Sequence, residues 1–542
     1  MYTSKVDLPK LLDELNAIGI ALSAEKNHDR LLEMILIRAR EITNADGGTL
    51  YTRTEEDALR FEIMITDSLN IHMGGPGGEP IPFKPIPLYN ADGSPNKNNV
   101  AACAVIENKT INIPDAYTNE EFDFSGTRKF DQNTGYRSRS FLTVPMTNHE
   151  NRIIGVLQLI NSTDPETGQV AAFSPLDQQL VESLASQAAV TITNKSLIDA
   201  QKKLFDSLIK LIADAIDEKS PYTAGHCRRV PILTNMLANA ACNIQVGSLK
   251  AFTMTEEEKY ELDVAAWLHD CGKITTPEYV VDKGTKLETI LDKIDLVDVR
   301  FEVLKRDAEI ASLKRRLAEL GEFPPAGDEE LEKQLARLDA DREFIRQRNV
   351  GGEAITEEDI REIDRIATYQ WRTPNGTIEN LLDEEEVDNL KIARGTLNVM
   401  EREIINNHVS VTIKMLQSLP YPQHLQRVPE YAGGHHEKMD GTGYPNRLKR
   451  DEMSIQARMV AIADVFEALT AGDRPYKKGM SLSKSLSILG RMKLGNHIDP
   501  DLFDVFMWDK IYLKYAEQYL KPEQIDDVDL AAIPGYVPPP VN

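Results

Sequence analysis

Apolar residues recur at helical spacing at the start of the chain, for example at Leu11 and Leu15 and again at Leu31 and Ile35. This spacing predicts two helices within residues 10–45. The pattern stops at residues 44–48, where the run Asn-Ala-Asp-Gly-Gly is typical of a turn. A different kind of structure is expected to follow.

Short runs of β-branched and aromatic residues, separated by Gly, Pro and Asn, occupy the next part of the chain. Runs of this kind predict strands rather than helices. Together with the preceding helices they indicate an α+β domain of the sensor type. The expected strands are Thr49–Tyr51, Phe61–Thr66, Thr110–Ile113, Ser140–Pro145 and Arg152–Asn161.

Between Asp177 and Glu218 the apolar residues return to helical spacing, without a single Pro or Gly. This predicts one long helix that leaves the first domain and enters the next. Such a helix presents an apolar stripe that a second copy of the chain could cover, which suggests a parallel dimer. The alternative is a helix packed on its own domain.

Residues 283–395 are dense in Glu, Lys, Arg, Leu and Ile, with a break at Gly321–Gly327 that suits the turn of a helical hairpin. We find no catalytic constellation there, and interpret the segment as a charge-rich solvated hairpin that serves as a lid or a dimer contact. The prolines of Ile533–Asn542 predict an extended tail.

Composition narrows the choice of partners and compartment. Of the 542 residues, 62 are Lys or Arg and 86 are Asp or Glu, a net charge of −24 that disfavours nucleic acids and anionic membranes. The four cysteines form no C-x-x-C pair, which favours a reducing compartment. Neither a signal peptide nor a membrane-spanning run is apparent, so we expect a cytoplasmic protein.

The candidate chemistry lies after the long helix, in residues 219–542, which hold seven of the ten histidines. Five imidazoles and two carboxylates there occupy separate apolar segments, where a lone polar group is costly. A single such histidine is more often a hydrogen-bonded core residue. Seven such groups together indicate that their side chains converge on a metal site. The absence of thiolates suits iron or manganese, and seven ligands suit two ions with a bridging carboxylate. The set is His226, His269, Asp270, His408, His435, His436 and Asp464.

Four segments of the N-terminal region together resemble a GAF domain over roughly residues 20–195. They are Asn112–Tyr117, Asp131–Arg137, Ser140–Met146 and Ile154–Asn161. The resemblance implies a central antiparallel sheet between helices, with a cleft for a small ligand.

A part of the signature of cyclic-nucleotide-binding GAF domains is also present. Arg128-Lys-Phe-Asp131 resembles its Asn-Lys-Phe-Asp-Glu motif, without the Asn and the Glu. This makes Lys129 and Asp131 candidate contacts to a small cyclic nucleotide. The alternative is a surface ion pair beside a strand.

A second resemblance rests on His269-Asp270-Cys-Gly-Lys273 and on the run from His435-His436 to Gly443-Tyr444-Pro445. These motifs resemble those of HD-GYP domains, over residues 200–284 and 395–525, with a helical insertion between them. The resemblance implies an all-helical bundle and a bacterial phosphodiesterase that opens cyclic di-GMP, giving linear pGpG and often GMP.

The resemblance also implies roles for individual residues. The seven residues above match the family's metal ligands, with Asp270 as the bridge. Lys273 matches the lysine that meets a substrate phosphate or the leaving oxygen, so Asp270 and Lys273 are the candidate catalytic residues. The expected substrate contacts are Lys273, Gly443, Tyr444, Pro445, Arg474 and Lys477. Without the family, Lys273, Arg474 and Lys477 resemble ordinary surface cations.

One position departs from the family pattern. Members with three metals carry a Glu four residues before the first ligand His, and here that position is Tyr222. Tyrosine is a poorer ligand at neutral pH, so we predict a binuclear centre of iron or manganese.

The sequence thus predicts a multidomain α+β and all-α protein. The expected parts are a GAF-like sensor (1–175), a linker helix (176–218), an HD-GYP domain (219–525) with a helical insertion (284–395), and an extended tail (526–542). The expected function is a GAF-regulated, homodimeric cyclic di-GMP phosphodiesterase. Alternatives are a phosphodiesterase for cyclic GMP-AMP or a cyclic mononucleotide, and a non-catalytic receptor or scaffold, which would be expected to lack some of the ligands.

Overall fold

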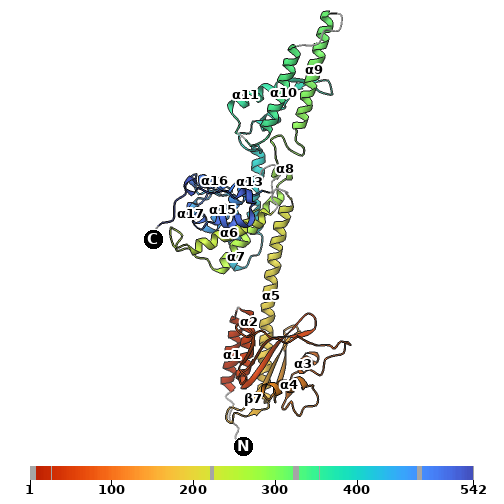
Figure 1. Ribbon diagram of the computed structural model, residues 1–542, viewed down its shortest axis with the longest axis vertical. Helices are drawn as coiled ribbons and strands as arrows, with labels where there is room; N and C mark the ends of the chain where they lie inside the picture. The colour runs from red at the N-terminus through yellow and green to blue at the C-terminus, as the bar shows by residue number, and fades with distance from the viewer. Residues whose placement is uncertain are drawn as a thin grey trace. The chain divides into compact units, whose positions relative to one another are not determined.

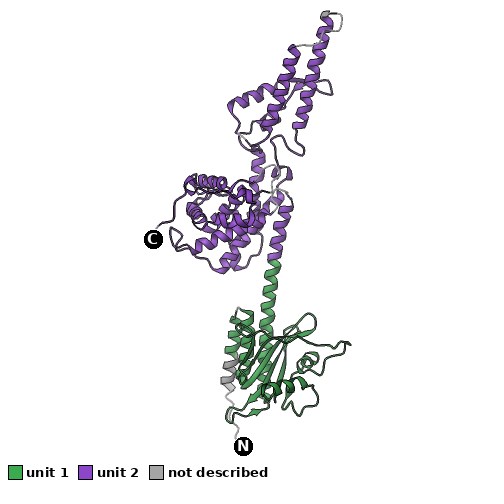
Figure 2. Cartoon of the chain, viewed as in Figure 1, with its two compact units in different colours: residues 1–205 green, residues 206–542 purple. Residues whose placement is uncertain are grey.

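The computed structural model of the chain describes residues 8–25, 27–219, 225–320, 329–352, 354–472 and 479–540. It divides into two compact units, residues 1–205 and 206–542 (Figures 1 and 2). Helix α5 (Pro175–Lys219) begins in the first unit and ends in the second. Among the described residues, no helix combines the length and the apolar character that a membrane span requires.

The first unit is built on one antiparallel sheet with the strand order β3-β2-β1-β7-β6-β5, to which β4 and β8 add short pairs with β2 and β7. Each of the five strands expected from the sequence lies within or overlaps one of these. The strands are β1 (Ala45–Arg53), β2 (Ala58–Thr66), β3 (Ile71–Gly74), β4 (Ile86–Pro87), β5 (Ile111–Ile113), β6 (Phe141–Thr147), β7 (Ile153–Thr163) and β8 (Val170–Ala171).

Alternate residues of the strands face two different helical layers. On one face, Leu50 and Leu157 join a core formed with α1 (Leu8–Ala24), α2 (His28–Thr43) and the first half of α5. On the other face, Tyr51 and Val156 pack against α3 (Val100–Glu107), which lies with α4 (Ser125–Thr134) on that side of the sheet (Figure 1).

The second unit is mostly helical and carries the predicted ligands. Its central helix, α15 (Ile455–Thr470), is apolar on nearly all sides and is therefore buried. Its other helices outside residues 284–395 are α6 (His226–Asn243), α7 (Glu256–Leu268), α8 (Glu278–Val281), α13 (Val399–Gln417), α14 (Val428–Gly433), α16 (Leu482–Leu494), α17 (Pro500–Trp508) and α18 (Ile511–Tyr519). Short 3-10 turns are η1 (Cys271–Thr275), η2 (Gln423–Leu425), η3 (Arg450–Glu452), η4 (Pro522–Gln524) and η5 (Leu530–Ala532).

The segment interpreted as an insertion has a hydrophobic core of its own, which includes Val297, Phe301, Ile345, Ile363 and Leu390. The expected helical hairpin corresponds to α9 (Ile294–Leu320) and α10 (Glu329–Asn349), followed by α11 (Glu357–Ala367) and α12 (Glu384–Leu390). The sequence did not predict the small hairpin of β9 (Gln370–Arg372) and β10 (Ile378–Asn380), which is only three residue pairs long.

The predicted tail, residues 526–542, contains the short turn η5, after which the chain has no helix or strand as far as residue 540. This segment is nevertheless held in place, because Trp508 donates its Nε1–H to the carbonyl of Val537 and Lys493 donates to that of Gly535. The predicted fold class, an α+β unit joined by a long helix to a mostly helical one, is confirmed.

Candidate metal centre

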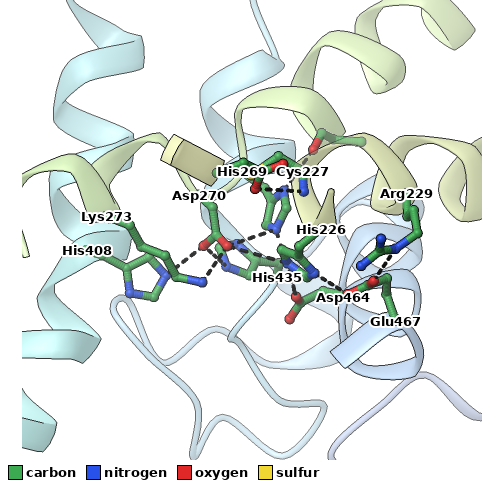
Figure 3. A network of polar contacts seen from close by, with 12 residues as sticks. His226, Cys227, Arg229, His269, Asp270, Lys273, His408, His435, Asp464 and Glu467 are labelled. Carbon is green, nitrogen blue, oxygen red and sulfur yellow. Dashed lines mark hydrogen bonds and ion pairs between the residues drawn. The ribbon is translucent and has the colours of Figure 1, made fainter. Parts of the chain in front are cut away.

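All seven predicted ligands lie in one buried cluster of the second unit (Figure 3 shows six of them). They come from segments far apart in the sequence: the start of α6, the turn after α7, α13, the segment after α14, and α15. Within each of three subsets, one donor atom per residue lies within 4.8 Å of the others. The subsets are His408, His435 and His436; His226, His269 and Asp464; and His269, Asp270 and His435.

Asp270 lies between the subset that contains His226 and the subset that contains His408. Its Oδ2 is 3.5 Å from Nε2 of His226 and 3.4 Å from Nε2 of His269. Its Oδ1 is 3.2 Å from Nε2 of His408 and 3.8 Å from Nε2 of His435. Each carboxylate oxygen thus faces a different subset, which is the arrangement expected of a bridging ligand.

Three of the imidazoles are oriented by the same local contact. The Nδ1 atoms of His269, His408 and His435 lie 2.7, 2.5 and 2.6 Å from the backbone carbonyls of Ala266, Ile405 and Ala432, three residues earlier in each case. A carbonyl oxygen only accepts hydrogen bonds, so each Nδ1 carries the proton. Each Nε2 therefore presents its lone pair to the cluster.

These groups fit a cation. Nε2 of His269, His408 and His435 and Oδ1 of Asp270 are all buried without a hydrogen-bond partner. Buried polar atoms are rarely left without a partner, and here the four atoms direct lone pairs toward one another. A metal ion is the partner that satisfies imidazole nitrogens and carboxylate oxygens together.

Burial makes two of the histidines available as ligands. It lowers the pKa of His435 well below its ordinary value, an effect that the neighbouring His436 and His269 reinforce. Burial also lowers the pKa of His436 to about 4. Both rings are therefore neutral near pH 7, the state in which imidazole coordinates metal.

His226 has a different environment because it lies among carboxylates. Burial alone would lower its pKa, but Glu467, Asp270 and Asp464 together raise it well above the ordinary value. Its Nε2 is 3.2 Å from Oδ1 of Asp464, and its Nδ1 pairs with Oε2 of Glu467. A cation bound between these carboxylates would take the place of the imidazole proton.

Glu467 contacts the candidate ligand His226, and the sequence did not reveal this. It is buried, and besides His226 it accepts a 2.6 Å hydrogen bond from Nε of Arg229. A carboxylate on the far nitrogen of a ligand imidazole fixes the ring and increases its basicity. The sequence feature that could have revealed Glu467 is its position one turn after Asp464 on an apolar helix, where a second buried carboxylate needs a partner.

The turn that carries His269 and Asp270 packs unusually close to α13. A Cβ atom on Gly272 would lie 2.0 Å from the carbonyl oxygen of His408, a distance at which no side chain fits. The amide of Gly272 also donates a 2.9 Å hydrogen bond to Oγ1 of Thr412. Glycine at this position therefore lets Asp270 approach the helix that carries His408.

Lys273 lies at the edge of the cluster. Its Nζ is 2.5 Å from Oδ2 of Asp270, and its side chain is 20% exposed whereas that of Asp270 is 3% exposed. Burial would lower the pKa of Lys273, but Asp270 raises it, so the side chain remains an ammonium at neutral pH. A cation between the buried carboxylate and the exterior can reach a bound anion.

The Gly-Tyr-Pro segment reaches the cluster through its tyrosine. The ring of Tyr444 stacks on that of His436, with centroids 4.8 Å apart and an interplanar angle of 18°. Gly443 is buried against the backbone of Glu437, because a Cβ atom on Gly443 would lie 2.5 Å from Cα of Glu437. Tyr444 and Pro445 are half-buried, so this segment supports His436 from the side.

Three of the predicted positions lie outside the described residues. Arg474 and Lys477 fall in residues 473–478, and Tyr222 falls in residues 220–224. The expectations for phosphate contacts at Arg474 and Lys477, and for two ions rather than three, therefore remain predictions from the sequence.

In the first unit, Asp131 is buried and Lys129 is exposed. Asp131 accepts hydrogen bonds from the hydroxyl of Tyr117 at 2.7 Å and from the amide and hydroxyl of Ser138, both at 2.8 Å. Its carboxylate therefore links Tyr117 and Ser138 within the domain.

Two family models match the chain. Residues 27–192 match the GAF domain, and residues 385–502 match the HD domain. The chain contains a GAF domain followed by an HD domain. The segment that matches the HD domain holds His408, His435, His436 and Asp464, whereas the other three candidate ligands precede residue 284. Folding of the chain brings the matched segment together with the segment of residues 226–273 that holds those three.

Similar proteins match short parts of the chain. It is 39% identical over 109 residues to a 3′3′-cGAMP-specific phosphodiesterase of Vibrio cholerae, covering 20% of this chain and 23% of that protein. It is 42% identical over 73 residues to a cyclic di-GMP phosphodiesterase of Pseudomonas aeruginosa, covering 14% and 17%. It is 32% identical over 139 residues to a cyclic di-GMP phosphodiesterase of Thermotoga maritima, covering 26% and 36%. Each match thus spans well under half of the relative's length.

Proposed function

We propose that this protein is a metal-dependent phosphodiesterase that hydrolyses cyclic di-GMP to pGpG, the product from which a second cleavage would give GMP. The observation that carries the proposal is the position of Asp270, whose two oxygens face two separate sets of buried histidines. The similarity to enzymes that hydrolyse cyclic dinucleotides supports the choice of substrate class. A scaffold without catalysis would not need this complete donor set.

The proposed cofactor is a pair of iron or manganese ions. One ion would be held by His226, His269 and Asp464 and the other by His408, His435 and His436, with Asp270 shared. Two such ions would supply Lewis acidity toward the phosphodiester and lower the pKa of an attacking water. Metal analysis that finds three ions per chain would contradict the binuclear assignment.

The chain itself contributes position and charge. Lys273 offers an ammonium to the phosphate oxygens or to the leaving oxygen, where negative charge grows as the ester bond breaks. Asp270 orients Lys273 through their 2.5 Å contact. Arg474 and Lys477 are proposed to bind the phosphates, for which a guanidinium fork and an ammonium are suited. These local cations and the metal ions would offset the overall charge of −24.

The decisive experiment is an assay of the manganese- or iron-loaded protein against cyclic di-GMP, cyclic GMP-AMP and cyclic GMP. The control is the His269→Ala/Asp270→Ala double variant. We expect the wild type to hydrolyse cyclic di-GMP and the variant to be inactive. Equal turnover by both proteins would remove this cluster from the mechanism.

A second candidate substrate is cyclic GMP-AMP. The Vibrio cholerae relative named for that substrate favours it, and both substrates present two phosphodiesters in one ring. The same assay separates them, because a preference for cyclic GMP-AMP over cyclic di-GMP would replace the first choice.

We also propose that the protein is a homodimer regulated through its GAF domain. On α5, Leu197, Leu204 and Leu211 are spaced seven residues apart, with Leu208 between the last two, and their exposed fractions are 58%, 62%, 63% and 48%. This is the repeat of a coiled-coil seam, which a second copy of α5 would bury. Light scattering that finds a monomer for the wild type, or a dimer for Leu204→Glu/Leu211→Glu, would contradict this proposal.

The GAF domain is proposed to bind a small cyclic nucleotide near Lys129 and Asp131, and this binding would act on the HD domain through α5. Deletion of residues 1–170 tests this idea, because an unchanged rate and ligand response would count against it. The four cysteines are free thiols, which suits the reducing cytoplasm in which we propose that the enzyme acts.

A further inference from the structure

The last turn of α5 contacts two segments that carry candidate ligands. Its residues Asp217 and Lys219 each bind backbone groups of a different segment, Asp217 at the start of α6 and Lys219 at η1. Residues two apart on an α-helix point in different directions, about 200° around the axis. The end of α5 can therefore hold the two segments from different sides.

Lys219 binds the turn that follows Asp270. Its Nζ donates to the backbone carbonyls of Lys273 at 3.1 Å, Ile274 at 2.6 Å and Thr276 at 2.6 Å. An ammonium has three N–H donors, so this one turn uses all of them. Carbonyls at the end of a helical turn lack partners within the helix and attract cations.

The position of η1 matters because both candidate catalytic residues belong to it or adjoin it. Asp270 immediately precedes η1, and Lys273 lies within it. The amide of Lys273 also donates a 2.9 Å hydrogen bond to the carbonyl of Asp270, which makes them one rigid turn. A displacement of the η1 carbonyls would thus move Asp270 relative to His408 of α13.

Asp217 binds the beginning of α6, whose first residue is His226. Its carboxylate accepts a 2.9 Å hydrogen bond from the amide of Gly225 and lies 3.5 Å from the amide nitrogen of Cys227. The first amides of a helix need outside acceptors, and Gly225 at the N-cap has no side chain to provide one. Asp217, buried on a neighbouring helix, takes that role.

We propose that Asp217 and Lys219 are positioning residues through which the end of α5 sets the distance between His226 and Asp270. Neither touches the donor atoms themselves. The inference rests on the proposed phosphodiesterase function and adds a route by which the helix leaving the GAF domain acts on the centre. A shift or rotation of α5 would change the spacing of the ligands, and with it metal binding and turnover.

The test compares Lys219→Met and Asp217→Ala in the full-length chain with matched controls on the same helix. Lys210→Met removes a lysine that lies over the ring of Trp267, and Asp214→Ala removes an exposed ion pair with Arg228. Lys219→Arg and Asp217→Asn keep donors or an acceptor at the tested positions and serve as rescue variants.

The first measurement is amide hydrogen exchange in the metal-free protein, which does not depend on activity. We expect Lys219→Met to accelerate exchange in residues 271–276 but not in residues 226–230, and Asp217→Ala to do the reverse. The controls should leave both segments as in the wild type. Acceleration spread evenly over the helical unit in the tested variants would indicate general destabilisation and overturn the proposal.

The second measurement is Mn²⁺ affinity together with kcat and KM for cyclic di-GMP. A displacement of about 1 Å in a catalytic group typically costs about 100-fold in rate, so we expect kcat to fall about 10- to 100-fold with KM changed about twofold at most. Mn²⁺ should bind more weakly, and Lys219→Arg and Asp217→Asn should recover most of both losses.

The outcomes separate this inference from the proposed function. If the wild type hydrolyses no cyclic dinucleotide, the function is wrong, and the exchange pattern and Mn²⁺ affinity still decide the roles of Asp217 and Lys219. If the wild type is active and both variants match it in exchange, affinity and kcat, the positioning roles are wrong and the function stands. Should Lys219→Met fail to fold, Lys219→Gln, which keeps two donors, takes its place. Its kcat and its Mn²⁺ affinity must then be lower than those of Lys219→Arg, or the proposal fails.

Discussion

The ammonium of Lys273 lies 2.5 Å from Oδ2 of Asp270, three residues earlier, on the partly exposed side of an otherwise buried cluster. The contact joins the proposed bridging ligand to the cation proposed to meet the substrate. We expect Lys273→Met to lower kcat for cyclic di-GMP about 100-fold or more, because the loss of one group that stabilises developing charge typically has this effect. Mn²⁺ stoichiometry should be unchanged, and the surface variant Lys259→Met should match the wild type. Full activity of Lys273→Met would refute its catalytic role.

Glu467 should control metal affinity without being a ligand. Glu467→Gln leaves the shape of the side chain but removes the charge that pairs with Nδ1 of His226. Loss of such an outer carboxylate typically weakens metal binding about 10- to 100-fold, which a Mn²⁺ titration would measure. Glu517→Gln, an exposed change in the same unit, should have no effect. Equal affinities of wild type and Glu467→Gln would show that the contact does not support the centre.

Gly272 should tolerate no side chain. In Gly272→Ala the new methyl group would meet the backbone carbonyl of His408, which cannot rotate away as a side chain could. We expect a loss of about 3 kcal/mol in stability, at the upper end of the usual cost of overpacking, together with loss of Mn²⁺ binding. Gly352→Ala is the control, since its Cβ would meet nothing within 4 Å. Unaltered Mn²⁺ binding by Gly272→Ala would contradict the close approach of this turn to α13.

A buried lysine in the second unit predicts a dependence of stability on pH. Lys286 is fully buried, and its ammonium donates a 2.9 Å hydrogen bond to the carbonyl of Leu390. Burial, helped by the nearby Arg348, lowers the pKa of Lys286 to about 8. In the unfolded chain lysine titrates near roughly 10.4. Between these two pKa values the unfolded state holds a proton that the folded state has lost, so the free energy of unfolding rises with pH. The total rise is up to about 3 kcal/mol. Below about pH 8 the lysine is charged in both states, and the folded state bears the full cost of burying that charge.

The measurement is urea unfolding of Lys286→Met and its parent at several pH values. In a Trp267→Phe/Trp508→Phe background, Trp371 is the remaining tryptophan and reports on the helical insertion. We expect the methionine variant to be the more stable at pH 7 and its advantage to shrink as the pH rises above 8. Lys314→Met, at an exposed position of α9, should show no such trend. A constant difference between Lys286→Met and its parent across this range would show that Lys286 is not the titrating group.

The sequence was informative where function requires a residue type at a fixed place in a motif. The seven candidate ligands could be named because each is a polar residue in an apolar segment, and the motifs around His269 and His435 indicated how they belong together. The long helix and the main strands followed from hydrophobic spacing. The apolar faces of the strands and of the first half of α5 are buried against one another, whereas the leucines of its second half are exposed.

Other features depend on contacts that no local pattern encodes. Glu467 was missed because Asp464, one turn earlier, already accounted for an acidic residue on that helix. Asp217 and Lys219 resemble ordinary charged residues at the end of a helix, and only the structure shows that they bind backbone groups of segments far along the chain. Lys286 likewise resembles a surface cation in the sequence, whereas the helices around it enclose it completely.

The carbonyl contacts of His269, His408 and His435 have a consequence for how the site fills. Because the rings are held by their own helices, they are already aimed before any ion arrives, and capture requires little rearrangement of the protein. Selectivity then follows from a fixed cage of nitrogen donors, which suits ions that accept imidazole and rejects larger, oxygen-seeking ones such as Ca²⁺. Uptake should accordingly be limited by how fast an ion sheds its water shell and enters, rather than by a slow conformational change.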